Sequence, residues 1–421
     1  MKENEKLVKT APLYQTSKYR KIMLLTAILL LGVLDQAPAV VNSTIPAMTK
    51  VFEGHSLALI ESITTIVNMF VTVFVLVSGF LVNKIGQKQT ALLGIAIAAV
   101  SSIIPVFSES FYVVLASRAV LGVGIGLSNA LAASLLSAFF QGNELARYMG
   151  WRTAAGGVGT SLMTMAAGQL LRINWHFSYL VYILFIPTLF LFIFYVPEPE
   201  KYGVHLQNKK EDENVSTDVV GEEKFAGLGT VLALAVLFFF FLVGATIFGV
   251  KLAQLFVAEG IGSASDASVI SSIFTLSQMF GGMLFGYCYK HFGTKMLPVT
   301  ILLRGIPLLV IGMVTSKAVI ALMAVVFGLA GGMTVSLIFM TVSTVITPKN
   351  ATLYNAIPMT GSNLGAFCAP FLAKYMGDTP AAAMRNAGWM YACYVSCDHC
   401  CSGNRGKKKK DSISDTKNKE K

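Results

Sequence analysis

Long apolar runs of about twenty residues, separated by short polar turns, fill most of this 421-residue chain. A hydrocarbon core about 30 Å thick is crossed by roughly 20 helical residues. A helix also pairs its backbone hydrogen bonds within one segment, as lipid requires. Because only 13% of the residues are charged, about half the share typical of a soluble globule, the chain cannot cover a soluble surface. The sequence therefore predicts an all-α integral membrane protein.

The apolar runs form two series on either side of a polar stretch. The first series predicts a six-helix bundle over residues 22–196 and the second a helical bundle over 225–402. The linker between them, 197–224, mixes Lys with Glu and has no apolar period. A basic segment at 1–21 comes first, and a lysine-rich tail at 403–421 comes last. Because the first apolar run is too long for the apolar region of a signal peptide, we interpret it as the first span.

The expected twelfth span is degenerate. Only twelve residues separate Arg385 from Asp398, too few for an unaided crossing, and Asp398 and His399 fall where apolar residues are expected. An even number of spans is nevertheless needed to return the tail to the side of the amino end. Four cysteines surround His399: Cys393, Cys397, Cys400 and Cys401. A metal cluster is one interpretation, but we favour inert thiols in a damaged last helix and predict no metal site.

Lysine and arginine predict the orientation of the chain, because they concentrate in cytoplasmic loops. They are frequent in the amino-terminal segment, the linker, the tail and alternate turns such as those with Lys84 and Arg147. The opposite turns hold fewer cations, such as Lys50, Arg172 and Lys317. Both termini are therefore predicted to be cytoplasmic in a multi-pass cell-membrane protein. The net charge of +11 lies largely in the ends and loops, so membrane lipid, and no nucleic acid, is the expected partner.

One turn is repeated in the two halves. Residues 79–88 follow the second span and residues 286–295 follow the eighth, with glycine, glycine and lysine at identical positions 207 residues apart. Glycine permits close helix approach and a tight turn, and lysine anchors the turn at the anionic leaflet. The repeat indicates a duplicated transporter architecture. The residues expected to act in gating are Gly79, Asn83, Gly86, Lys88, Gly286, Gly293 and Lys295.

With these residues the chain resembles the major facilitator superfamily over nearly its whole length. The first turn is similar to the family's G-x-L-x-D-R-x-G-R-K signature, with Asn83 at the acidic position and Gln87 replacing the first basic residue of the final pair. In the fourth span, Arg118-Ala-Val-Leu-Gly122 is similar to the family's R-x-x-Q-G motif. The resemblance implies two six-helix bundles and alternating access. Because Asn83 is uncharged, it also implies a weakened charge lock at the cytoplasmic gate.

Two narrower features bear on the class of transporter. The chain as a whole is similar to the conjugated bile salt transporters of lactic acid bacteria, although no motif carries that resemblance. The antiporter signature of the family's fifth span is mostly missing, because Met163 and Thr164 stand where its Gly-Pro pair would align. Drug antiport is therefore less favoured but stays open. Gly122, Gly124 and Gly126 are assigned to helix packing in preference to a dinucleotide loop, because they lie inside a long apolar run. Gly157 and Gly159 are also assigned to helix packing.

Ionisable residues within the spans are the main functional candidates, because a charge in hydrocarbon costs at least ~2.5 kcal/mol. Asp35 lies fourteen residues from Lys21, which at about 1.5 Å per residue places it near the midplane. Arg118 is also expected near mid-depth. If the first and fourth helices face each other, as the resemblance implies, Asp35 and Arg118 pair and couple proton binding to conformation. A static ion pair that fixes helix packing is the alternative.

The other polar residues within the spans are candidates for binding the solute. Glu61 is expected to be an exposed rim carboxylate or an outer gate residue, Arg152 a cytoplasmic anchor, and Lys251 the marker of the outer end of the seventh span. Arg304 in the ninth span either binds an anion or extends its head group towards water. The asparagines bind the solute or a neighbouring helix. They are Asn42, Asn68, Asn129, Asn355 and Asn363.

Together these features predict a monomeric secondary transporter for a small amphipathic organic solute, driven by protons. The solute could be an organic anion such as a conjugated bile salt, or a drug, because the spans are rich in Met and Phe and poor in clustered polar groups. An uptake symporter or facilitator for another metabolite is the alternative, followed by a membrane sensor that does not transport. No phosphate-binding G-x-x-x-x-G-K-[ST] motif is present, so we expect no ATP-driven pump. A membrane enzyme would need a nucleophile, a metal cluster or paired acids within the spans, and because only the cysteine cluster comes near this, we expect no enzyme and no cofactor.

Overall fold

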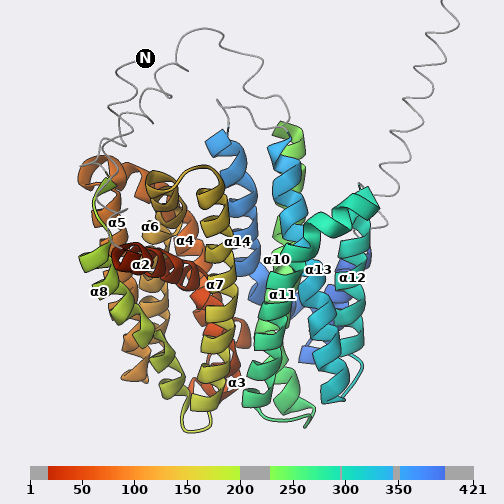
Figure 1. Ribbon diagram of the computed structural model, residues 1–421. Coiled ribbons are helices and arrows are strands. Elements are labelled where there is room, and N and C mark those ends of the chain that lie inside the picture. Colours follow the sequence, from red (N-terminus) through yellow and green to blue (C-terminus); the bar gives the residue numbers. More distant parts are fainter. Residues whose placement is uncertain (1–17, 200–227, 294–295, 345–350, 394–421) are drawn as a thin grey trace, which may run out of the picture.

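Two helical bundles lie side by side in the computed structural model, which describes residues 18–199, 228–293, 296–344 and 351–393 (Figure 1). These ranges contain α-helices and short 3-10 segments and no strand. The predicted all-α fold is therefore confirmed. Following the predicted orientation, we call the end that carries the α3–α4 turn the outer end and the end that carries the α4–α5 turn the inner end.

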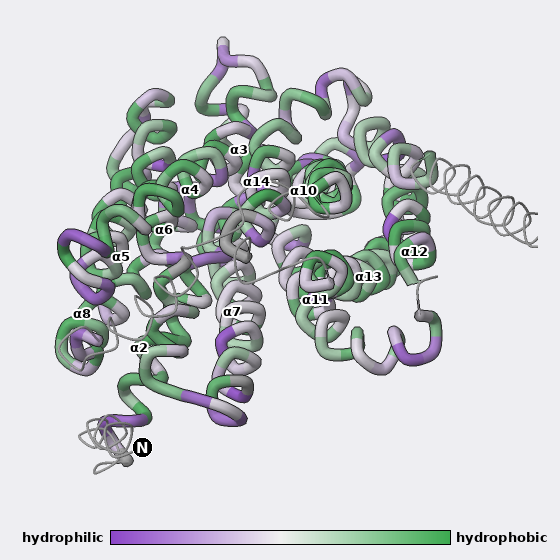
Figure 2. Tube along the Cα trace, turned by 90° about the horizontal axis from the view of Figure 1, so that it is seen from above, coloured by the Kyte–Doolittle hydropathy of each residue, from purple (hydrophilic) through white to green (hydrophobic). Residues whose placement is uncertain are grey.

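The first bundle holds six spans, one of which is broken near its middle. They are formed by α2 (Lys18–Gln36), η1 (Ala37–Thr44) and α3 (Ile45–Val51); α4 (Leu57–Ile85); α5 (Gln87–Ile103) with η2 (Ile104–Val106); α6 (Phe111–Phe139); α7 (Gly142–Leu170); and η3 (Trp175–Leu184) with α8 (Phe185–Tyr195). In both views α2 is steeply inclined to its neighbours (Figures 1 and 2). The break after α2 lies at Pro38, which has no backbone N–H and therefore cannot donate a helical hydrogen bond.

The second bundle holds five long helices and a short sixth. They are α10 (Leu228–Ala258), α11 (Ala264–Phe292), α12 (Met296–Ile311), α13 (Lys317–Ser343), α14 (Ala351–Met376) and a helix over 380–393. Eight of the helical segments in the described chain are long and apolar enough to cross a membrane. The sixth helix begins before Arg385, and its predicted polar end at Asp398 and His399 lies outside the described residues. So do the linker from residue 200 onwards and the basic tail.

Both repeated turns end a helix on a glycine with positive φ. Gly86 ends α4 with φ of 86°, and Gly293 ends α11 with φ of 53°. A side chain is disfavoured in this region of backbone space, which accounts for glycine at both places. By contrast, a Cβ atom at Gly79 or Gly286 would meet nothing within 4 Å. In this conformation the first glycine of each turn is therefore not required for close helix approach.

A second duplicated feature lies within the membrane. On α6, Gly122 and Gly126 face α4, and a Cβ at Gly122 would stand 2.5 Å from the carbonyl oxygen of Val67. On α13, Gly328 and Gly332 face α11 in the same way, 206 residues further along the chain. Small residues four apart let helix backbones approach closely, which is how helices associate in lipid. The equivalent helix pairs of the two halves are thus packed by equivalent glycines.

The bundles meet along two helix pairs, α7 with α11 and α4 with α14. Viewed from above, α7 and α11 are neighbours, with α14 beside α10 and α4 (Figure 2). On α7, Ser161 donates a hydrogen bond of 2.9 Å to the carbonyl oxygen of Ser272 on α11. Nearer the outer end, Ser265 donates to the carbonyl oxygen of Gly168. These contacts join the bundles in the outer half of the molecule.

We predict that Gly122→Ala lowers the thermal unfolding midpoint, because the new methyl group overlaps α4 and overpacking costs about 1–3 kcal/mol. Gly150→Ala is the matched control, since Gly150 is exposed on α7 and a Cβ there meets nothing within 4 Å. The control should be neutral or slightly stabilising. Equal midpoints for the two variants in the same detergent would contradict the role of this glycine in packing.

Candidate functional site

A buried ion pair joins the two bundles near the outer end. Lys251 on α10 lies 2.5 Å from the carboxylate of Glu61 on α4, and the Gln254 side chain donates to the same carboxylate oxygen at 2.6 Å. The Glu61 side chain is fully buried and the Lys251 side chain is 6% exposed. The prediction that Glu61 is an exposed rim carboxylate is therefore wrong. Its place between the bundles is compatible with the alternative, an outer gate residue.

A second ion pair lies within the first bundle and partly faces open space. Asp35, at the end of α2, accepts a hydrogen bond from Arg152 on α7, and the two side chains are 10% and 22% exposed. The second carboxylate oxygen of Asp35 and the Nε atom of Arg152 are buried without hydrogen-bond partners among the described residues. The pair thus has unused hydrogen-bonding capacity.

Arg118 does not pair with Asp35 in this structure. Its guanidinium donates to the carbonyl oxygen of Pro38 at 2.8 Å and to the hydroxyl of Tyr182 at 3.2 Å. That hydroxyl donates in turn to the carbonyl oxygen of Ala37 at 2.9 Å. These carbonyls belong to the start of η1, where the chain changes from an α-helix to a 3-10 helix. The expected Asp35–Arg118 pair is therefore absent, and Arg118 bonds to the backbone of η1 and to Tyr182 instead.

Arg304 is fully buried inside the second bundle. None of its three guanidinium nitrogens has a hydrogen-bond partner among the described residues. Instead the guanidinium lies 3.9 Å from the ring centre of Phe241, 4.0 Å from that of Phe327 and 5.6 Å from that of Tyr391. Desolvated cation–π contacts contribute about 2 kcal/mol each. The expectation that Arg304 extends towards water does not hold in this conformation, because the aromatic rings surround its head group.

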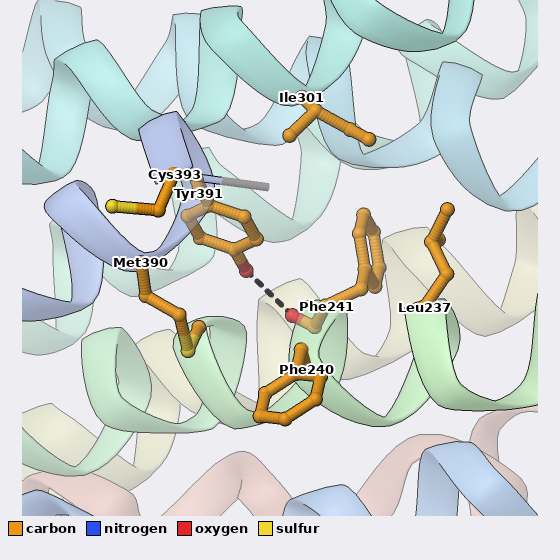
Figure 3. Close-up of a pocket in the computed structure, with 7 residues that line it drawn as sticks. All are labelled: Leu237, Phe240, Phe241, Ile301, Met390, Tyr391 and Cys393. Carbon is orange, nitrogen blue, oxygen red and sulfur yellow. Dashed lines mark hydrogen bonds between the residues drawn. The ribbon is translucent and has the colours of Figure 1, made fainter. Parts of the chain in front are cut away.

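An apolar cavity of about 260 Å³ lies beside this aromatic cage, between α10, α12 and the helix over 380–393. Phe241 and Tyr391 form walls of both the cage and the cavity, and the Tyr391 hydroxyl donates to the carbonyl oxygen of Phe241 at 2.6 Å (Figure 3). The other lining residues are apolar or sulfur-containing. Cys393 at its edge is exposed, and the remaining predicted cysteine cluster lies outside the described residues.

The predicted asparagines do not gather into one site. Asn42 on η1 lies against α10, where a Cβ at Gly249 would stand 2.9 Å from its amide nitrogen. Asn68 donates to the carbonyl oxygen of Thr65 in its own helix. Asn129 and Asn363 are half-buried on α6 and α14, and Asn355 is exposed on α14. Asn42 thus lies at a contact between the bundles.

The inner turn of the first bundle carries no charge at its acidic position. Asn83 is exposed, and Lys88 donates to the carbonyl oxygen of Ile193 at 3.1 Å, which joins α5 to α8. Lys295, its counterpart in the second half, lies outside the described residues. Gly157 faces Met279 on α11, and Gly159 faces Val33 on α2. These two glycines therefore lie at helix contacts, one of them between the bundles.

Arg152 and Lys251 were predicted at the membrane surfaces because two helices are longer than their apolar runs. The apolar run of the fifth span begins at about Met149, but α7 begins at Gly142, which places Arg152 about 15 Å along the helix. The apolar run of the seventh span ends at about Val250, but α10 continues to Ala258. Both cations are therefore deep enough to need a carboxylate. The sequence feature that could have shown this is the absence of a helix-ending residue between each apolar run and the observed helix end.

The sequence profile of the Major Facilitator Superfamily matches residues 24–250 and again 234–395. The chain belongs to this superfamily of membrane transporters. Both matches together cover the two bundles, in agreement with the duplicated turns and glycines. The narrower likeness to bile salt transporters stays a prediction.

Two relatives match parts of the chain. An uncharacterized transporter of Rickettsia felis is 24% identical over 261 residues, which cover 59% of this chain and 60% of the relative. The riboflavin transporter RibZ of Clostridioides difficile is 26% identical over 201 residues, 47% of this chain and 41% of the relative. The chain thus matches less than two thirds of the length of either relative.

Solved structures share the fold across the described length. A partially occluded inward-open form of the xylose transporter XylE from E. coli has a TM-score of 0.70 at 14% identity and covers 90% of this chain and 97% of that one. The peptide transporter POT has a TM-score of 0.72 at 12% identity and covers 92% and 95%. At this identity the likeness shows the fold alone.

We predict that Glu61→Gln lowers stability markedly, because it leaves the Lys251 ammonium buried without a counter-charge, and breaking such a pair costs about 3–5 kcal/mol. The double variant Glu61→Gln/Lys251→Met should recover most of the loss. Asp266→Asn is the matched control, since the Asp266–Lys317 pair is exposed and such pairs contribute about 0–1 kcal/mol. Thermal unfolding in one detergent measures all three. A midpoint for Glu61→Gln equal to that of the control would contradict the burial of this pair.

Proposed function

We propose that this protein is a proton-coupled secondary transporter that moves a small amphipathic organic solute by alternating access. The observation that carries the proposal is that the two bundles are joined at the outer end by the buried Glu61–Lys251 pair, whereas the Asp35–Arg152 pair lies in the first bundle with unused polar atoms. Opening the outer end requires the first pair to separate. The second pair is placed to respond to a proton or a solute.

Proton coupling is proposed to act through Asp35. A proton on its carboxylate removes the charge that holds Arg152, so α2 and α7 lose an ionic contact. Any conformation in which Asp35 and Arg152 are further apart therefore binds the proton better, by linkage. The role first expected of Arg118 is changed accordingly: we propose that it stabilises the break after α2, so that Asp35 stays at a fixed depth.

The solute class follows from the walls of the contact between the bundles. Asn42 and Gln254 offer amide groups there, and Met279 contributes an apolar surface beside Gly157. Few polar groups on an apolar wall favour an amphipathic solute over a sugar. The Arg152 side chain, which is 22% exposed beside Asp35, favours an organic anion, which keeps a conjugated bile salt among the candidates. A drug or riboflavin, the substrate named for the Clostridioides difficile relative, is a candidate of the same amphipathic kind.

The termini are proposed to be cytoplasmic and the protein to work as a monomer in the cell membrane. With that orientation, the conformation described here is closed towards the outside. Direction of transport then follows from the ion gradient. Flux of a transported solute under an imposed pH gradient distinguishes an exporter that exchanges protons from a symporter that takes solute up with them.

The first experiment identifies a solute. Purified protein is tested by thermal shift against taurocholate, riboflavin and xylose, and a compound that raises the midpoint is then followed in proteoliposomes. We expect an amphipathic compound to stabilise the protein and xylose not to. Stabilisation by xylose alone would contradict the proposed solute class.

We predict that Asp35→Asn abolishes pH-gradient-driven transport of that compound while leaving insertion and folding intact, because the amide cannot bind and release a proton. Asp266→Asn, which changes an exposed outer carboxylate, should transport at the wild-type rate. Undiminished gradient-driven transport by Asp35→Asn in the same vesicles would refute the proposed coupling site.

A further inference from the structure

A pocket of about 260 Å³ lies at the outer end, on the seam between the bundles. Its walls come from both halves: Pro46, Ala47, Lys50, Leu171 and Arg172 from the first, and Val257, Ser263, Ala264 and Ser265 from the second. The pocket therefore exists in this form only while the outer ends are together. Ser265 on its wall is the residue that donates across the seam to Gly168.

Both charged residues in this wall are cations, and both are unusual for their side of the membrane. Lys50 and Arg172 are among the few cations on the predicted outer face, which the positive-inside bias disfavours. A third such cation, Lys317, is neutralised by Asp266 at 2.9 Å. Within the described chain, Lys50 and Arg172 form no ion pair. Two outer cations without a counter-charge thus line the same pocket.

The rest of the wall is suited to an organic group. Pro46, Ala47, Leu171, Val257 and Ala264 supply an apolar surface next to the two cations. The Ser263 hydroxyl oxygen accepts from the backbone nitrogen of Asp266, which leaves its hydrogen free to donate. An apolar wall with a few convergent polar groups is the usual composition of a small-molecule site. A purely inorganic anion would use only the cationic part.

We propose that this pocket is an outer-face binding site for an amphipathic organic anion, whose carboxylate, sulfonate or phosphate group lies between Lys50 and Arg172. The proposal does not require that the bound anion be the transported solute. Charge-assisted hydrogen bonds to Arg and Lys hold the anionic group, and the apolar residues hold the organic part.

The test measures binding of naphthalene-2-sulfonate to the full chain in phosphatidylcholine nanodiscs by calorimetry. The double variant Lys50→Gln/Arg172→Gln should raise the Kd at least tenfold. Lys317→Gln, which removes the paired outer cation, should stay within twofold of wild type. Lys50→Arg/Arg172→Lys keeps both charges and should retain binding, which separates loss of the site from loss of the fold.

Three results with soluble ligands would overturn the proposal, and a fourth concerns lipid. One is equal binding by the charge-removed and wild-type proteins. Another is that the neutral 2-naphthol binds as tightly as naphthalene-2-sulfonate, which would show that the pocket selects only an apolar group. A third is that inorganic sulfate competes as well as naphthalene-2-sulfonate itself, which would show a simple anion site. Nanodiscs that contain phosphatidylglycerol distinguish the source of the anion. Unchanged affinity supports a soluble anion, whereas competitive weakening would assign the pocket to a lipid head group and overturn the proposal for a small solute.

Discussion

Every polar group buried between these helices needs a partner inside the protein, because the surrounding hydrocarbon offers none. The structure meets this requirement in three ways. Arg118 and Tyr182 donate to backbone carbonyls at the start of η1, where the first span changes from an α-helix to a 3-10 helix. Aromatic rings enclose Arg304 in the second bundle. Glu61 and Lys251 neutralise each other across the contact between the bundles. The first two devices fix the interior of one bundle each, whereas the third joins two bodies that a transporter must separate.

Whether an ion pair lies within one bundle or between the two bundles decides whether it must break during alternating access. A buried pair within one bundle survives rocking of the bundles, but a pair across the seam cannot. Asp35 and Arg152 lie within the first bundle, yet on adjacent helices of which one is steeply inclined and broken (Figure 1). Their separation can therefore change without unfolding of either helix. We therefore propose that the Glu61–Lys251 pair acts on the choice of conformation and that the Asp35–Arg152 pair acts on the binding of a proton.

The architecture could be predicted from sequence because its signals are local and repeated. Long apolar runs define the spans, and the turns at Gly86 and Gly293 show the duplication at equivalent helix ends. The candidate site could be predicted only as a set of residues. Asp35 and Arg118 were recognised as charges in hydrocarbon, whereas Glu61 was expected at the outer rim or gate, and the observed partners of all three were not predicted. The partners depend on where α7 and α10 begin and end and on the helix break at Pro38. The length of an apolar run predicts the end of a helix only to within about two turns. Arg152 and Lys251 were consequently placed at the surface.

The central claim is that the Glu61–Lys251 pair holds the outer ends of the two bundles together. The distance between the outer ends can be measured by pulsed electron paramagnetic resonance with spin labels at Ile173 and Met313 in a cysteine-free background. These residues lie near the outer ends of the first and second bundles and are 71% and 65% exposed. The account predicts one short distance in the parent protein and an added longer distance in Glu61→Gln. A distance distribution that Glu61→Gln leaves unchanged, in a folded protein, would contradict it.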